Sequence, residues 1–484
     1  MFFYAALAVL AMPAVAAQQV AFMAPMHSKM VQASPFGEDH PATAVKNTGT
    51  LRVTENSGVC ETTPGVYQAS GYADIAEDKS IWFWFFAARH DPDNKPLVAW
   101  FNGGPGATSM VGLFSELGPC RTLNDSSGVE LNPTSWTEYA NVIFIDSPTG
   151  VGFSQGTPTV SSAREAAADI WEFFQTWFSD DHFSKYLDRE FGIWTESYGG
   201  HYGPAFSEYF LEQNGVLSQG LASGHPVNLK YLGIGNGLTD ALLQYPKLIE
   251  YSERNPYHPL VSPEDIETGK VAFEGPGGCR ERLVACAELD TDAACSNATV
   301  FCNDNLLWKL HGEWDPNYII TPRERADEYP SNFIPWLTSS DVVQAIGAEL
   351  PFTPGNADIA KNFQDKGDWM RSTKPRLERV IDAGVRVVLY AGDVDFLCNY
   401  MGVEILMDNL HTRFSTEYAK QEWANYTVNS VSAGVYKNAG TLSYARLWGA
   451  GHLVPAYGLP GVPRGAAALQ MFTQIMSNQS LSGT

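Results

Sequence analysis

Ser197 lies where an apolar run gives way to small and turn-forming residues. The run Phe191–Trp194 is typical of a buried strand, and from Tyr202 onward aromatic side chains recur at helical spacing. We therefore expect Ser197 at a sharp strand-to-helix corner, where its hydroxyl points outward and the N–H groups of the helix start are free. An acyl-transfer nucleophile needs this environment. Thr195 stands where the general G-x-S-x-G elbow has Gly.

Two aspartates and a histidine follow this serine along the chain, each in a loop after a predicted strand. Asp393 and Asp395 lie in one loop, and His452 lies in a Gly-rich loop further on. Singly, each is compatible with a structural role, such as satisfying a turn. Serine, then acid, then histidine is the chain order of the α/β-hydrolase triad. In that triad the histidine accepts the serine proton, and the carboxylate holds the imidazole in the correct tautomer.

The segment Trp100–Gly106 reads Trp-Phe-Asn-Gly-Gly-Pro-Gly and follows a predicted strand. Its glycines let backbone N–H groups approach a ligand, so the loop can supply an oxyanion-hole donor. A tight Gly-Pro turn is the structural alternative. No Lys-Ser or Lys-Thr follows the glycines, which argues against a nucleotide-binding loop. The pair Asp393 and Asp395 lacks the later ligands of a calcium loop, and we expect neither a metal nor another cofactor.

Short apolar runs alternate with helical patterns along much of the chain. A helix is predicted over Ala163–Phe178, and this alternation indicates an α/β fold with a mainly parallel central sheet flanked by helices. Residues 239–340 interrupt the alternation, and we expect an inserted, disulfide-containing lid between core segments 51–238 and 341–484. The predicted strands are Ile81–Phe86, Pro96–Phe101, Asn141–Ile145, Phe191–Trp194, Leu229–Ile234, Val385–Tyr390 and Leu442–Trp448.

Composition and the N-terminus indicate a secreted protein. The chain of 484 residues is 44% hydrophobic and carries a formal charge of −23, which disfavours nucleic acid and anionic membranes as partners. Residues 1–17 resemble a signal peptide, although no basic residue stands near the start, so a buried N-terminal segment is the alternative. Residues 18–50 are expected to be a pro-segment or a surface arm. We expect neither a transmembrane helix nor a lipid anchor.

The seven cysteines support this compartment. Four of them allow three pairings, of which we favour the nested one, Cys279 with Cys302 and Cys286 with Cys295. Cys60 with Cys120 is then the remaining bridge, and Cys398 is left unpaired. The candidate glycosylation sequons are those of Asn124, Asn297, Asn425 and Asn478.

Together these motifs resemble the serine carboxypeptidase family, which includes yeast vacuolar and fungal secreted enzymes with the α/β-hydrolase fold. The resemblance implies Ser197 as nucleophile, Asp395 rather than Asp393 as the orienting acid, His452 as base, and an oxyanion hole formed by the N–H groups of Gly104 and Tyr198. The family patterns W-x-N-G-G-P-G, E-S-Y-x-G, A-G-D-x-D-F-x-C-N and G-x-G-H-x-V-P are matched by Trp100–Gly106, Glu196–Gly200, Ala391–Asn399 and Gly449–Pro455.

The resemblance also implies how a substrate's terminal carboxylate is bound. A carboxylic acid can donate a hydrogen bond to a carboxylate only while protonated, and crowded carboxyl groups share protons. We therefore expect a peptidase favoured at acidic pH. The carboxylate-binding residues implied are Asn102, Gly103, Glu116 and Glu196, and the residues implied to line an apolar pocket are Val111, Ser115, Cys398 and Leu453.

One family cysteine, directly after G-G-P-G, is replaced by Ala107, which indicates that one family disulfide is missing. The expected function is a secreted or vacuolar serine-type carboxypeptidase that releases single C-terminal residues from peptides or proteins through an acyl-enzyme. An acyltransferase or esterase on the same scaffold is the alternative, and a non-catalytic binding protein is the third reading. The sequence leaves the oligomeric state open.

Overall fold

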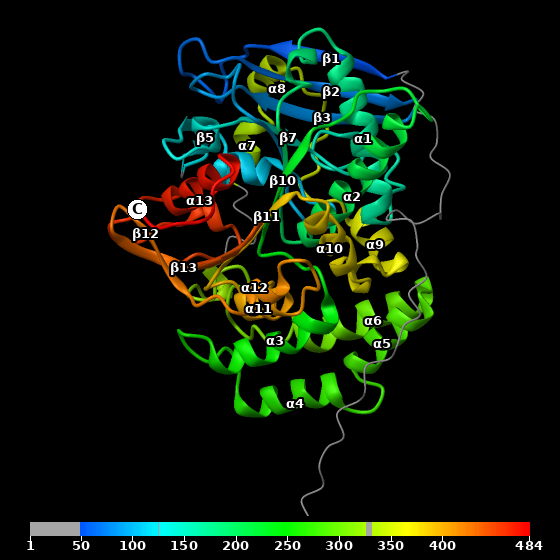
Figure 1. Cartoon of the computed structure of the whole chain (residues 1–484), viewed down its shortest axis with the longest axis vertical. Helices are drawn as coiled ribbons and strands as arrows, with labels where there is room; N and C mark the ends of the chain where they lie inside the picture. The colour runs from blue at the N-terminus through cyan, green and yellow to red at the C-terminus, as the bar shows by residue number, and fades with distance from the viewer. Residues whose placement is uncertain (1–48, 124, 326–331) are drawn as a thin grey trace, which may run out of the picture. The chain divides into compact units, whose positions relative to one another are not determined.

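The computed structural model describes residues 49–123, 125–325 and 332–484. The predicted signal peptide, nearly all of the predicted N-terminal arm and the sequon at Asn124 lie outside these residues. The structure belongs to the α/β class, with a mixed, largely parallel central sheet flanked by helices, as the alternation of strand and helix patterns predicts (Figure 1).

In the central sheet the strand order is β1-β2-β3-β7-β4-β9-β10-β11-β14-β13-β12, and β8 pairs with β3. The strands from β7 to β14 in this order run parallel to one another, whereas the pairs toward both edges are antiparallel. The strands are β1 Thr50–Glu55, β2 Gln68–Ala76, β3 Lys79–Phe86, β4 Leu97–Phe101, β7 Asn141–Ile145, β8 Gln155–Gly156, β9 Phe191–Glu196, β10 Leu229–Gly235, β11 Arg386–Gly392, β12 Ala424–Val428, β13 Val431–Ala439 and β14 Leu442–Leu447. A separate ribbon pairs β5 Cys120–Thr122 with β6 Val129–Leu131.

All seven predicted strands are present, with their ends shifted by at most two residues. The predicted helix is α1, and the helix expected after Ser197 is α2. The α-helices are α1 Ala163–Ser179, α2 Gly199–Ser218, α3 Ala241–Arg254, α4 Pro263–Glu274, α5 Cys279–Leu289, α6 Asp292–Cys302, α7 Ile334–Leu337, α8 Ser340–Ile346, α9 Ala357–Lys366, α10 Lys374–Asp382, α11 Tyr400–Asp408, α12 Ser415–Tyr418 and α13 Ala466–Met476.

The apolar runs are continuous because both faces of the sheet are buried. Along β3, Phe83 and Phe85 belong to one hydrophobic cluster, whereas Trp82 and Trp84 belong to the cluster on the other face. Successive strand residues point to opposite faces, so a strand covered on both sides needs an apolar residue at every position.

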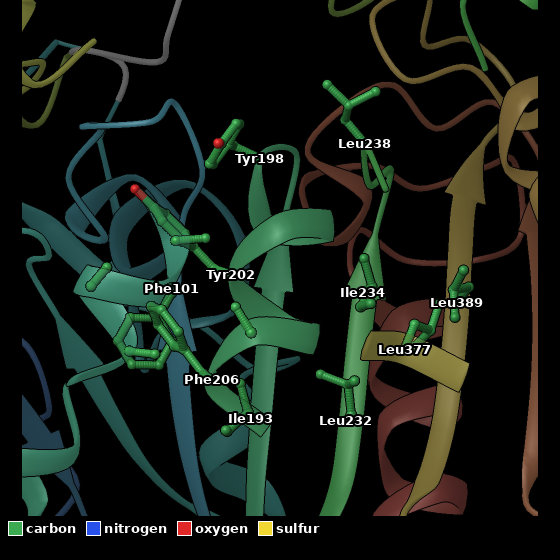
Figure 2. Packing of buried hydrophobic residues seen from close by; sticks show 14 of the residues in the cluster. Phe101, Ile193, Tyr198, Tyr202, Phe206, Leu232, Ile234, Leu238, Leu377 and Leu389 are labelled. Carbon is green, nitrogen blue, oxygen red and sulfur yellow. The ribbon is translucent and has the colours of Figure 1, made fainter. Parts of the chain in front are cut away.

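Helix α2 is anchored on the sheet by its aromatic face. Figure 2 shows Tyr202 and Phe206 of α2 beside Phe101 of β4, and the rings of Phe101 and Phe206 meet edge to face with centroids 5.1 Å apart. Burying one such side chain contributes about 1.5–3 kcal/mol. This packing fixes the start of α2, directly after Ser197, relative to the ends of β4 and β9.

The described residues 239–325 and 332–340 contain helices in place of strands of the central sheet. Helices α3, α4, α5 and α6 pack against one another and lie together in Figure 1. Disulfides join Cys279 to Cys302 and Cys286 to Cys295, and a third joins Cys60 to Cys120, which are the pairings that the sequence favours. No helix among the described residues is long and apolar enough to cross a bilayer.

The three described sequon asparagines are exposed. Asn297 lies on α6 and receives a hydrogen bond from the Arg282 guanidinium, whereas Asn425 lies on the edge strand β12. Asn478 follows α13 and accepts a hydrogen bond from Arg386. Their glycosylation stays a prediction.

The disulfides differ in the length of chain they close, and we expect their stabilising effects to differ in the same order. The sequence separation is 60 for Cys60–Cys120 and 9 for Cys286–Cys295. Replacing both cysteines of the longer loop with Ser should lower the free energy of unfolding by about 4 kcal/mol, and replacing those of the shorter loop by about 2–3 kcal/mol. Denaturant titration of the two double variants measures this, and a larger loss for the shorter loop would contradict it.

Candidate active site

Ser197 occupies the corner between β9 and α2 in a conformation that few residues adopt. Its φ is 63°, in the left-handed region, and it is partly exposed between two buried neighbours. Its N–H donates to the carbonyl of Gly235 at 3.0 Å, and its own carbonyl accepts from the N–H groups of Gly200 and Leu238, each at 3.0 Å. These bonds hold the corner against the end of β10 and present the serine at the sheet edge.

The loop after β4 packs directly on this corner. A Cβ at Gly103 would lie 2.4 Å from the Tyr198 nitrogen and 2.8 Å from the Ser197 Cβ, so only glycine fits there. The next residue, Gly104, has a φ of 109°. Neither the Gly104 N–H nor the Tyr198 N–H donates to another group in the described part of the chain. Both backbone donors beside Ser197 are therefore available to a ligand oxygen.

His452 and Asp395 form a buried pair. His452 Nδ1 lies 3.0 Å from Asp395 Oδ2, and the two residues are 3% and 0% exposed. Burial lowers the pKa of His452, but the negative charges of Asp395, Glu116 and Asp315 outweigh it, so the pKa is raised above its ordinary value. The imidazole is thus held with Nδ1 toward a carboxylate, the arrangement that a histidine base needs.

The two aspartates of the β11 loop have different environments. Asp393 accepts from the Gly449 N–H at 2.7 Å and from the Tyr257 hydroxyl at 2.8 Å, so it binds the start of the histidine loop and not the imidazole. Asp395 is the residue beside His452. The geometry thus favours Asp395 as the orienting acid.

A residue that the sequence analysis missed, Asn236, completes the environment of Asp395. Its Nδ2 donates to Asp395 Oδ2 at 2.7 Å, and its Oδ1 accepts from the Gly392 N–H at 3.1 Å. The N–H groups of Leu397 and Cys398 also donate to the carboxylate, each at 3.0 Å. In the sequence, Asn236 stands out as a polar residue between two glycines just after the predicted strand Leu229–Ile234. That strand follows the one before Ser197 along the chain.

Two glutamates and an asparagine form a second buried group. Asn102 Nδ2 lies 3.2 Å from Glu196 Oε1 and 3.4 Å from Glu116 Oε1. Its Oδ1 accepts from the Trp100 indole N–H at 2.8 Å and from the Gly112 N–H at 3.0 Å, which fixes the amide orientation. The amide N–H₂ therefore points at the two carboxyl groups.

The two carboxyl groups are placed to share a proton. Burial raises the pKa of Glu116 to about 7. Burial and the charge of Glu116 raise the pKa of Glu196 well above its ordinary value. The Oε2 atoms of both are buried without a conventional partner among the described residues, while the two side chains lie within hydrogen-bonding reach of each other. A proton shared between the two carboxyl groups would relieve the repulsion between their charges.

The four residues expected to line a pocket lie around these groups. The short helix η1, Gly112–Leu117, carries Glu116. Val111 directly precedes this helix and Ser115 lies within it, and both side chains are buried. Leu453 is buried directly after His452, and the Cys398 N–H binds Asp395. Cys398 is the one free cysteine in the described part of the chain, and burial raises the pKa of its thiol. Which substrate group they contact stays a prediction.

Comparison with known proteins gives consistent matches. Residues 59–478 match the family model described as serine carboxypeptidase. Carboxypeptidase S1 of Penicillium janthinellum is 37% identical over 89% of this chain and all of its own length. Carboxypeptidase Y of Schizosaccharomyces pombe is 35% identical over 84% of this chain, which covers 41% of that longer protein. The structure of Kex1Δp, a prohormone-processing carboxypeptidase from Saccharomyces cerevisiae, has the same fold, with a TM-score of 0.69, 21% identity, and coverage of 87% of this chain and 92% of its own.

The contact between Asn236 and Asp395 leads to a test that needs no knowledge of the substrate. In Asn236→Gly the buried carboxylate loses one donor, while the backbone, whose φ is 40° at this position, stays unstrained. Loss of a hydrogen bond to a charged group should slow fluorophosphonate labelling of Ser197 by about ten- to a hundredfold. Asn429→Gly is a matched control, because Asn429 is an exposed asparagine with a φ of 50°. Equal labelling rates in the two variants would show that Asn236 does not support the site.

Proposed function

The chain belongs to the serine carboxypeptidase family and is a serine-type carboxypeptidase, a hydrolase, and we propose that Ser197, His452 and Asp395 are its catalytic triad. The observation that supports this most directly is the buried His452–Asp395 pair at 3.0 Å. Asp395 also accepts a hydrogen bond from Asn236, which directly follows the Gly235 carbonyl that binds the Ser197 N–H. Peptides are the substrates that the family implies.

In the proposed acylation step, Ser197 Oγ attacks the carbonyl carbon of the last peptide bond while His452 takes the hydroxyl proton. The tetrahedral intermediate carries its negative charge on the former carbonyl oxygen, which the N–H groups of Gly104 and Tyr198 would stabilise. His452 then gives its proton to the leaving amine, and the C-terminal residue departs. Water attacks the acyl-enzyme with His452 again as base, which restores the free serine. Asp395 keeps Nδ1 of the imidazole protonated throughout.

We further propose that Asn102, Gly103, Glu116 and Glu196 recognise the terminal carboxylate. Their support is chemical: the Asn102 amide is fixed, and the two glutamates lie close enough to share a proton. With that proton the pair can donate a hydrogen bond to a carboxylate, and without it two negative charges would repel the substrate. An exopeptidase arises when this group lies one residue beyond the nucleophile. A carboxylate receptor distinguishes a peptidase from an esterase.

The carboxyl pair and His452 should limit activity at opposite ends of the pH range. The pKa of Glu116 is raised to about 7 and that of Glu196 well above its ordinary value, so the pair keeps its shared proton throughout the acidic range and gives it up only as pH rises through the raised pKa of Glu196. His452 must be neutral to act as base, and its pKa is raised, so activity falls as the imidazole becomes protonated at low pH. Peptide hydrolysis should therefore have a bell-shaped pH profile, with an acidic limb set by His452 and an alkaline limb set by the carboxyl pair.

Two further features belong to this proposal. Residues 239–340 act as a lid on the loop edge of the sheet, and the protein is secreted or vacuolar. The three disulfides support an oxidising compartment. An acyltransferase or esterase would use the same triad, but it would have no use for a buried carboxyl pair next to the nucleophile.

The proposed peptidase activity can be tested by incubating an N-blocked peptide at several pH values, from about pH 4.5, near the reference carboxyl pKa values, to about pH 6.5, near the reference histidine value, beside the same peptide amidated at its C-terminus. Mass spectrometry should show stepwise loss of single residues from the free acid and much slower loss from the amide. Cleavage of a simple ester with neither peptide shortened would support the acyltransferase or esterase instead.

The role of the carboxyl pair predicts a substrate-dependent effect of Glu196→Gln. A glutamine amide donates a hydrogen bond at any pH, so the fall in peptide kcat/KM on the alkaline limb should become shallower. Hydrolysis of an uncharged ester needs no carboxylate recognition, so its pH profile should keep its shape. Glu130→Gln, at an exposed position on β6, is the control. The same change in both profiles would remove Glu196 from carboxylate recognition.

A further inference from the structure

A turn in the predicted lid, formed by residues 315–319, contacts both loops of the proposed triad. The turn is closed by its own first residue: Asp315 Oδ1 accepts from the Asn317 N–H at 2.8 Å, and the Asp315 carbonyl accepts from the Tyr318 N–H at 3.1 Å. The Asp315 N–H donates to the Thr321 carbonyl at 2.9 Å, and this bond joins the two ends of the segment 315–321. Asp315 is only 6% exposed, and a carboxylate capping its own turn in this way is a common device.

The carbonyl groups of this turn receive hydrogen bonds from the catalytic loops. The His452 N–H donates to the Asn317 carbonyl at 2.8 Å, and the Phe396 N–H, next to Asp395, donates to the Pro316 carbonyl at 3.1 Å. In return the Ile319 N–H donates to the Val394 carbonyl at 3.1 Å. One short segment therefore links the backbone on either side of Asp395 to the backbone of His452.

The packing around this link leaves little room for adjustment. A Cβ at Gly451 would lie 2.4 Å from the Asn317 carbonyl oxygen and 2.9 Å from the Tyr318 ring. On the same side, the rings of Tyr318 and Tyr457 stack with centroids 4.8 Å apart. A change in the shape of the turn would be transmitted to the backbone that carries His452.

We propose that Asp315 is a positioning residue of the reaction: by holding the turn 315–319 in shape, it sets His452 against Asp395. This inference rests on the proposed triad. Asp315 contributes in a second way, through its charge. The carboxyl groups that act on His452 are Asp395, Glu116 and Asp315, and each raises the pKa of the imidazole against the effect of burial. A variant that keeps the shape of the turn but loses the charge should change the pH dependence of activity, whereas a variant that also loses the shape of the turn should lower kcat.

Asp315→Asn and Asp315→Ala separate the two contributions. Asparagine keeps the Oδ1 acceptor for the Asn317 N–H and removes the charge, so the plateau kcat for an uncharged ester should stay close to that of the unaltered enzyme. The acidic limb of its pH profile should move to lower pH, because His452 loses a nearby negative charge. Alanine loses the acceptor as well, and kcat should fall about ten- to a hundredfold with little change in KM, since the base is displaced. Glu313→Gln removes an exposed acid two residues away and should change neither quantity.

Fluorophosphonate labelling of Ser197 in the unaltered enzyme separates failure of this inference from failure of the triad. If Ser197 is labelled and both Asp315 variants keep the kcat and the acidic limb of the unaltered enzyme, Asp315 is not a positioning residue. If Ser197 is not labelled, the triad itself is wrong, and the inference fails with it. Thermal unfolding of each variant identifies a loss of kcat that comes from unfolding, and Asp315→Asn keeps the test valid if Asp315→Ala does not fold.

Discussion

The buried pair of Glu116 and Glu196 is the constraint on which the proposed chemistry depends. Two carboxyl groups removed from water cannot both be ionised at moderate cost, so the pair holds a proton that exposed glutamates would have lost. Burial raises the pKa of Glu116 to about 7, although hydrogen bonds with Glu196 and Asn102 act to lower it. The fixed amide of Asn102 faces both groups. In the proposed mechanism this proton lets the carboxyl pair donate a hydrogen bond to the negatively charged C-terminal carboxylate of the substrate.

The parallel sheet explains how residues far apart in sequence meet. Strands β4, β9, β10, β11 and β14 are neighbours and run the same way, so the residues after their carboxyl ends lie at one edge. Glu196 and Ser197 are consecutive at the end of β9, which couples the proposed carboxylate receptor to the nucleophile through one peptide unit. The fixed separation of receptor and nucleophile would limit cleavage to the last peptide bond.

The sequence was informative wherever a local pattern determined structure. Buried strands read as unbroken apolar runs, and the glycines and polar residues at their ends marked the site loops, so the fold class and the Ser197, Asp395 and His452 loops were predictable. The antiparallel strands β12 and β13, the last two at one side of the sheet, were missed because half-exposed strands mix polar and apolar residues. Asn236 and the turn at Asp315 were missed because their contacts with Asp395 and His452 are formed only in the folded chain, and both look like ordinary turn residues in isolation.

Proton uptake on binding tests the central claim most directly. Calorimetric titration of the Ser197→Ala variant with an N-blocked peptide acid, in buffers of different ionisation enthalpy, measures protons taken up without turnover. We predict proton uptake where the free pair has lost its shared proton, an affinity that falls as pH rises through the raised pKa of Glu196, and loss of the uptake when Glu196→Gln is added. Affinity that does not change with pH, with no proton exchanged, would contradict the claim that a shared carboxyl proton binds the chain end.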